Sequence, residues 1–147
     1  MCLTDAKTLK HDNNIICYKV VASVLDKDGN EGKLVSPYFS KKSWKIGKTE
    51  AIPTIRRNVV LYGNKCVYDG AYHSFEKLSD AQKLANKKNS IYKKFTNIRY
   101  EYKVAECIIP KSSQWTYCGK FNIGFKNDEG DCNCYASQKL KPIRIVG

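Results

Sequence analysis

Apolar residues recur along this chain with strand-like spacing in most segments and with helix-like spacing in one. Besides a short strand that ends in residues 72–75, seven segments are predicted strands because they are rich in β-branched, aromatic or alternating apolar residues: 15–25, 33–36, 59–62, 66–68, 99–109, 133–137 and 142–146. The turn-forming residues between the first two predict a β-hairpin. The 99–109 segment alternates at first and becomes apolar toward its end, which indicates a central strand buried on both faces there.

Helix-like spacing is confined to residues 79–95. Ser79 and Gln82 form a capping-box pattern, in which each side chain bonds the backbone N–H of the other residue at a helix N-terminus. The apolar positions that follow recur at close to helical intervals: Ala81, Leu84, Ala85, Tyr92 and Phe95. Strands on either side of one helix predict a single α+β domain, with a twisted, mainly antiparallel sheet and one principal helix at about 79–95.

The length of 147 residues fits one domain. Residues 1–13 are polar and are expected to form a flexible N-terminal arm, which leaves 14–147 as the α+β domain. No segment approaches the ~20 apolar residues of a membrane-spanning helix, so we expect no membrane partner. The N-terminus lacks the charged, apolar and small-residue order of a secretory signal, which predicts an intracellular protein.

The seven cysteines indicate free thiols, because their number is odd and their spacing is irregular. Cys17 and Cys107 lie inside apolar runs, where cysteine is commonly a small buried hydrophobe. Cys132 and Cys134 are separated by one residue, which is closer than the knuckles that usually hold zinc. We therefore expect no metal site.

The net charge of +12 favours a polyanionic partner such as nucleic acid. The composition weakens that interpretation, because only four of the 26 basic residues are arginine, whose planar fork reads bases and phosphates bidentately. The lysines are also scattered along the chain, and an AT-rich genome produces the same bias without selection for binding. Direct nucleic-acid binding therefore stays one alternative among several.

The strongest candidate site begins at Tyr72, His73 and Ser74, where a short predicted strand runs directly into the helix. Polar and aromatic side chains beside a helix N-terminus are a common setting for a nucleotide or another anionic small molecule. His73 can act as an acid or base near neutral pH, or it can be a structural histidine. Tyr18 and Tyr135, on two further strands, are predicted to line the same cleft.

Signatures of common catalytic sites are missing from the sequence. It contains no phosphate-cradling glycine loop, no nucleophile elbow and no zinc-protease motif, so the catalytic residues are unknown. Residues 111–131 are polar and are expected to form a long loop. That loop carries aromatic residues that are candidate anchors for a partner protein: Trp115, Tyr117, Phe121 and Phe125.

Three segments together resemble the small rifampin-type ADP-ribosyltransferases, over roughly residues 66–147. Residues 72–75, Tyr-His-Ser-Phe, run into an alanine-containing helix and are similar to the Tyr-Phe-Ser step of that family. Residues 102–110 stand where the family has a Tyr-x-Val-Glu-Pro strand, and residues 134–147 are similar to its two closing strands. The chain also resembles small proteins of gut-bacterial phages with a Gly-x-His-x-Phe pattern.

The transferase resemblance implies NAD as cofactor, with Tyr72 stacking on nicotinamide and His73 or Glu106 in a polar role. Two departures reduce the support for that chemistry. The family has a histidine on its first strand, where this chain has Tyr18. The family also has an acidic residue after the Val-Glu-Pro strand, where residues 111–114 read Lys-Ser-Ser-Gln.

Our leading hypothesis is a phage-type accessory protein that binds an anionic, nucleotide-like ligand in a cleft lined by Tyr18, Tyr72, His73, Ser74 and Tyr135. The alternatives are an NAD-dependent ADP-ribosyltransferase, a basic nucleic-acid-binding protein, and a module that binds a virion or host protein. For a viral protein the expected location is the host cytoplasm.

Overall fold

The computed structural model describes residues 2–36, 39–52, 59–62, 65–68, 71–92, 100–122 and 131–147. Most of them form a mainly antiparallel sheet, and one helix packs on it, so the predicted α+β class is confirmed. The elements are β1 (Cys2–Thr8), β2 (Ile15–Leu25), β3 (Glu31–Ser36), β4 (Phe39–Trp44), β5 (Glu50–Ala51), β6 (Val59–Tyr62), β7 (Lys65–Tyr68), β8 (Tyr72–Phe75), α1 (Leu78–Tyr92), β9 (Tyr100–Ile109), β10 (Thr116–Asn122), β11 (Asp131–Ser137) and β12 (Lys139–Ile145).

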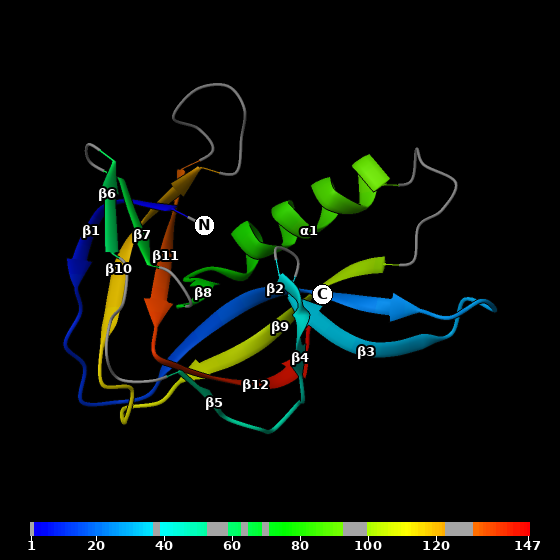
Figure 1. Cartoon of the computed structure of the whole chain (residues 1–147), viewed down its shortest axis with the longest axis horizontal. Coiled ribbons are helices and arrows are strands. Elements are labelled where there is room, and N and C mark those ends of the chain that lie inside the picture. Colours follow the sequence, from blue (N-terminus) through cyan, green and yellow to red (C-terminus); the bar gives the residue numbers. More distant parts are fainter. Residues whose placement is uncertain are drawn as a thin grey trace.

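The strands follow the order β5-β12-β9-β2-β8-β11-β10-β1-β7-β6, and β3 and β4 branch from β2. The longest pairing joins β2 to β9, from Ile15 opposite Ile109 to Val24 opposite Tyr100. One face of the apolar end of β9 is buried, because Cys107 and Ile109 are 0% exposed. Ile108, on the other face, keeps some contact with solvent, so burial on both faces at this end was predicted wrongly. The sheet bends strongly, so that the strands from β11 to β6 stand at a steep angle to β2, β9 and β3 (Figure 1).

Helix α1 lies against β9, β2 and β8. Its apolar stripe is buried, with Ala81 and Ala85 at 0% and Leu84 at 6% exposure. Near its end, the Asn89 side chain accepts a hydrogen bond from the backbone N–H of Tyr102 (2.8 Å) and donates one to the same residue's carbonyl (2.9 Å). The predicted helix of 79–95 therefore matches α1, and 93–95 lie outside the described residues.

Two apolar clusters lie on opposite faces of the central strands. The cluster on the helix face includes Val20, Phe75, Leu84 and Val104. The cluster on the other face includes Cys17, Tyr72 and Ala105, with Trp44 at the end of β4 packed against it. Because alternate residues of β2 and β9 feed the two clusters, these strands are covered on both faces.

Four strands lie where no strand was predicted: β1, β4, β5 and β10. Strands β4 and β5 lie within residues 38–58, which were expected to be irregular. Residues 2–8, within the expected flexible arm of 1–13, form β1, which pairs with β10 and β7. Residues 116–122, within the expected loop of 111–131, form β10. Both strands carry polar residues on an exposed face, so their apolar signal comes from one face only. Residues 123–130 lie outside the described part of the chain.

Helix α1, which has 15 residues and is rich in polar side chains, is neither long enough nor apolar enough to cross a membrane, and it is the one helix among the described residues.

Candidate functional site

Strand β8 brings the predicted site residues into neighbouring strands. It pairs with β2 through Phe75 opposite Tyr18, and with β11 through Ser74 opposite Tyr135. Tyr18, Tyr135 and the segment 72–74 therefore lie within three adjacent strands.

The sheet divides these residues between its two faces. Tyr18 packs against the cluster beneath α1, and the alternation of side chains along β8 places His73 on the same face as Phe75. Tyr72 and Tyr135 pack against the opposite cluster. Five side chains on two faces of one sheet cannot line a single cleft, so the predicted cleft is not assembled.

Burial restricts three of the five residues further. Tyr72 is 8% exposed and meets Trp44 edge-on, with ring centroids 5.1 Å apart. Ser74 is 0% exposed, and neither its hydroxyl nor His73 Nε2 has a hydrogen-bond partner among the residues that the structure describes. Burial, with the Lys19 ammonium nearby, lowers the pKa of His73 to about 3. The imidazole is therefore neutral at pH 7. Its Nε2 atom is buried, although other atoms of the residue keep some contact with solvent, so Nε2 is poorly placed to exchange a proton with a ligand.

Sequence reasoning missed Lys19, the charged group closest to these residues. Its ammonium donates a hydrogen bond to the His73 carbonyl (2.9 Å) and lies 5.4 Å from the Trp44 ring centroid. Other atoms of the residue keep some contact with solvent, but burial of the ammonium lowers its pKa to about 8. A single lysine inside the apolar run of 15–25 was the available signal, because a charge there must find interior partners.

The interior polar cluster consists of Lys19, Ser74, Cys17 and Cys107 on one face of the sheet, and of His73, whose carbonyl bonds Lys19 while its ring lies on the other face. Burial raises the pKa of the Cys17 thiol, and it raises that of Cys107 to about 12. These thiols are protonated at neutral pH and have little nucleophilic character. The cluster is thus a set of enclosed, neutral or internally bonded groups around one ammonium, which is an arrangement suited to holding strands together.

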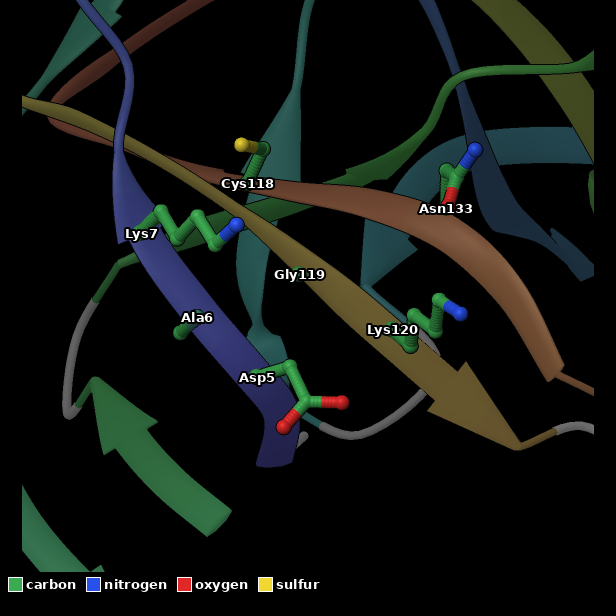
Figure 2. A pocket seen from close by; sticks show the side chains of 7 residues that line it. All are labelled: Asp5, Ala6, Lys7, Cys118, Gly119, Lys120 and Asn133. Atoms are coloured by element: carbon green, nitrogen blue, oxygen red, sulfur yellow. The ribbon is translucent and has the colours of Figure 1, made fainter. Parts of the chain in front are cut away.

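An open groove lies elsewhere, over β1, β10 and β11. It has a volume of about 560 Å³ and is lined by Asp5, Ala6, Lys7, Cys118, Gly119, Lys120 and Asn133 (Figure 2). Four of these side chains are exposed: Asp5, Lys7, Lys120 and Asn133. In Figure 2, Lys7 reaches from β1 across β10. The volume lies within the range of small-molecule sites, roughly 300–1,000 Å³.

A β-bulge in β1 builds this groove. Thr4 lies opposite Lys120 and Lys7 lies opposite Cys118, so Asp5 and Ala6 together oppose Gly119. Asp5 takes a left-handed backbone conformation, with φ of 54°. The extra residue resets the alternation of side chains, so that Lys7 points to the same face as Lys120.

Gly119 permits β1 to approach β10 this closely. A Cβ at this position would stand 2.9 Å from Leu3 Cβ, 3.0 Å from the Thr4 carbonyl oxygen and 3.2 Å from Ala6 Cα. Real Cβ atoms avoid such contacts, and two of the three neighbours are backbone atoms that cannot rotate away. The close approach of the bulged strand β1 to β10 therefore depends on a glycine at position 119.

The groove is electrostatically suited to an anion. Within the described part of the chain, neither Lys7 nor Lys120 forms an ion pair with a carboxylate. Tyr135 lies opposite Cys118 in the neighbouring strand, two residues from Asn133 on the same face. Burial, followed by the nearby Glu76 carboxylate, raises the pKa of Tyr135 to about 12, so its phenol stays neutral at pH 7. Of the five predicted residues, Tyr135 is the one that borders the groove.

Three or more metal-binding side chains do not converge anywhere in the described ranges, counting histidine, cysteine, aspartate and glutamate. Cys17, Cys107, Cys118, Cys132 and Cys134 are free thiols.

Comparisons with known proteins give this chain no family. No protein-family model matches it, and neither a curated protein nor a solved structure does. The resemblance to ADP-ribosyltransferases therefore stays a prediction. Of the polar residues it implied, His73 is enclosed, and Glu106 accepts a 2.8 Å hydrogen bond from the Arg144 guanidinium in an ion pair.

Proposed function

We propose that the protein acts by binding, as a phage-type accessory protein that holds an anionic, nucleotide-like ligand in the open groove. The observation that carries the proposal is that Lys7 and Lys120 line one cavity, with no carboxylate of the described residues paired to either ammonium. The Tyr/His cleft predicted from the sequence is replaced by a lysine-lined groove that Tyr135 borders.

The physical basis is attraction followed by contact. Two ammonium groups on one face, in a protein of net charge +12, raise the local concentration of anions. Each ammonium carries three N–H donors on a flexible stem and binds phosphate oxygens as a point charge. The half-buried ring of Tyr135 offers a flat apolar surface at the edge of the groove, on which a base can stack.

The enzyme alternative receives less support from the geometry. The transferase resemblance needs Tyr72 to stack on nicotinamide, yet this ring is 8% exposed and packed on Trp44. Stacking would require the Tyr72–Trp44 pair to open and the second apolar cluster to be disrupted. An NAD site at Tyr72 therefore demands a rearrangement that a site at the groove does not.

Thermal-shift titration with ATP, with inorganic triphosphate and with single-stranded DNA tests the proposal. A ligand that binds only the folded protein raises the melting temperature by mass action. We expect ATP to raise it more than triphosphate does, because the base adds contacts. Equal or larger shifts with DNA that fall steeply as salt increases would favour the nucleic-acid alternative.

A matched pair of variants locates the site. Lys7→Ala/Lys120→Ala removes two charges from the groove, and Lys77→Ala/Lys83→Ala removes two exposed charges at the start of α1. We expect the first pair to abolish the ATP shift and the second to retain it. Equal weakening by both pairs would show that only net charge matters, and the proposal would then be wrong.

A further inference from the structure

We infer that the ligand of the groove is a ribonucleotide and that Asp5 selects it by accepting hydrogen bonds from the ribose hydroxyls. This inference rests on the proposed function. It starts from a mismatch of charge, because a groove that attracts anions through Lys7 and Lys120 also exposes the Asp5 carboxylate (Figure 2).

The carboxylate has a cost for anion binding. An ionised carboxylate accepts hydrogen bonds and donates none, so it repels a phosphate placed on the neighbouring lysines. A ligand offsets that repulsion only when it carries hydrogen-bond donors close to its anionic group. A nucleoside phosphate has this composition, because the ribose hydroxyls lie between the phosphate and the base.

The backbone fixes where the carboxylate lies. Asp5 belongs to the two-residue bulge opposite Gly119, and it stands between Thr4, opposite Lys120, and Lys7, opposite Cys118. The two lysine positions are thus offset by two residues along β10, which is about 7 Å in a strand. A phosphate on the lysines therefore leaves the adjoining sugar within reach of Asp5.

The unusual conformation of Asp5 supports a recognition role. Its φ of 54° falls in the left-handed region, which aspartate and asparagine tolerate better than other residues with a Cβ. Bulges of this kind commonly re-aim a side chain beside a binding site. Carboxylates perform the same task in dinucleotide-binding folds, where one bonds the ribose 2′-hydroxyl.

Paired ribo- and 2′-deoxyribonucleotides test the inference. ATP, dATP, GTP and dGTP are titrated against the full chain, with dissociation constants measured by calorimetry or NMR. Losing one hydrogen bond to a charged group weakens binding about tenfold. We therefore expect wild type to bind each ribonucleotide about tenfold more tightly than its deoxy partner.

Asp5→Asn provides the decisive variant, because asparagine keeps the size and tolerates the same backbone conformation. It removes the negative charge, so deoxynucleotides should bind more tightly than to wild type, and the ribo-to-deoxy ratio should fall toward one. Asp28→Asn, in the exposed turn after β2, is the charge-matched control and should keep the wild-type ratio.

The outcomes separate this inference from the proposed function. If nucleotides bind through Lys7 and Lys120 but wild type shows no ribose preference, the role of Asp5 is wrong and the groove stands. A preference that survives in Asp5→Asn overturns the role of Asp5 equally. If no nucleotide binds wild type, the proposed function itself fails. A melting temperature of Asp5→Asn close to wild type establishes that the variant is folded.

Discussion

The interior polar cluster and the open groove place similar chemical groups in opposite surroundings. Each contains lysine and cysteine, and a tyrosine lies beside each. In the interior, burial lowers the pKa of Lys19 to about 8, and the ammonium bonds the His73 carbonyl. In the groove, Lys7 and Lys120 are exposed and have no carboxylate partner among the described residues.

The difference shows why residue type alone is a poor guide to a site. The side chains that sequence reasoning favoured at 72–74 pack in the interior, because β8 lies between β2 and β11 and both of its faces are covered. Lys7 in β1 and Lys120 in β10, which sequence reasoning did not identify as site residues, lie on strands with one exposed face. Exposure of polar side chains to solvent, rather than their chemical versatility, marks the groove as the candidate.

The largest contrast between the regions should be in thiol reactivity. Cys118 is partly exposed in the groove, whereas Cys17, Cys107 and Cys134 are 0% exposed. A buried thiol reacts only after the structure opens, and opening the core costs several kcal/mol. We expect a maleimide reagent to label Cys118 at least a thousandfold faster than the three buried thiols. Mass spectrometry of digested peptides measures the labelling rate of each cysteine.

Bound ATP should slow the labelling of Cys118 in wild type and leave it unchanged in Lys7→Ala/Lys120→Ala. Comparable labelling of Cys107 and Cys118 in the folded protein would contradict the burial difference on which the comparison depends.

The second contrast is in the response to acid. The pKa of His73 is lowered from 6.5 to about 3 in the folded protein, so below pH 6.5 the unfolded chain binds a proton that the folded chain does not. The contribution of the neutral His73 to the free energy of unfolding is therefore fully present above pH 6.5, and it is lost as the pH falls toward 3. Between pH 6.5 and 5 the loss should reach up to about 2 kcal/mol, because each pKa unit is worth about 1.4 kcal/mol.

Urea denaturation at half-unit pH intervals measures this slope, and His73→Leu should flatten it whatever its own effect on stability. His11 is the control, because its ring bonds the Asn13 carbonyl and the Thr116 hydroxyl outside the cluster. If His11→Leu flattens the pH dependence of the unfolding free energy and His73→Leu does not, the acid sensitivity does not come from the buried His73, and the prediction is wrong.

The sequence predicted the elements whose signal is local. The periodic apolar residues after Ser79 located α1, and the apolar end of β9 marked a central strand. The predicted N-cap was wrong, because α1 begins at Leu78 and the Gln82 side chain donates a hydrogen bond to Asn86. Strands β1 and β10 were missed because the bulge at Asp5 breaks the alternation in one, and a polar outer face interrupts the apolar pattern of the other.

The site could be predicted only in part, because burial depends on long-range pairing. Tyr72, His73 and Ser74 were correctly placed on a strand before the helix. Nothing in their neighbours along the chain shows that β2 and β11 flank that strand on both sides. The groove was hidden for the same reason, since Lys7 and Lys120 are more than a hundred residues apart and meet only through the register of β1 with β10.

The third contrast concerns packing. Gly119→Ala adds a methyl group that would stand 2.9 Å from Leu3 Cβ and 3.0 Å from the Thr4 carbonyl oxygen. We expect the free energy of unfolding to fall by about 1–3 kcal/mol, the usual cost of overpacking a well-packed site. Asn133→Ala, on an exposed position of β11, should change it by less than about 0.5 kcal/mol. An unchanged stability for Gly119→Ala would show that β1 does not approach β10 as closely as described.

The smallest effect on stability is expected where the effect on binding is largest. Lys7 and Lys120 are exposed and unpaired with described carboxylates, so Lys7→Ala/Lys120→Ala should change the free energy of unfolding by less than about 0.5 kcal/mol. The double variant should gain a little stability in low salt, because the folded chain carries a net charge of +12 and loses two repelling charges. Urea denaturation at low and high salt measures both quantities. A loss of several kcal/mol would mean that these lysines hold the fold together, as Lys19 does, and the distinction between a structural interior and a free binding surface would disappear.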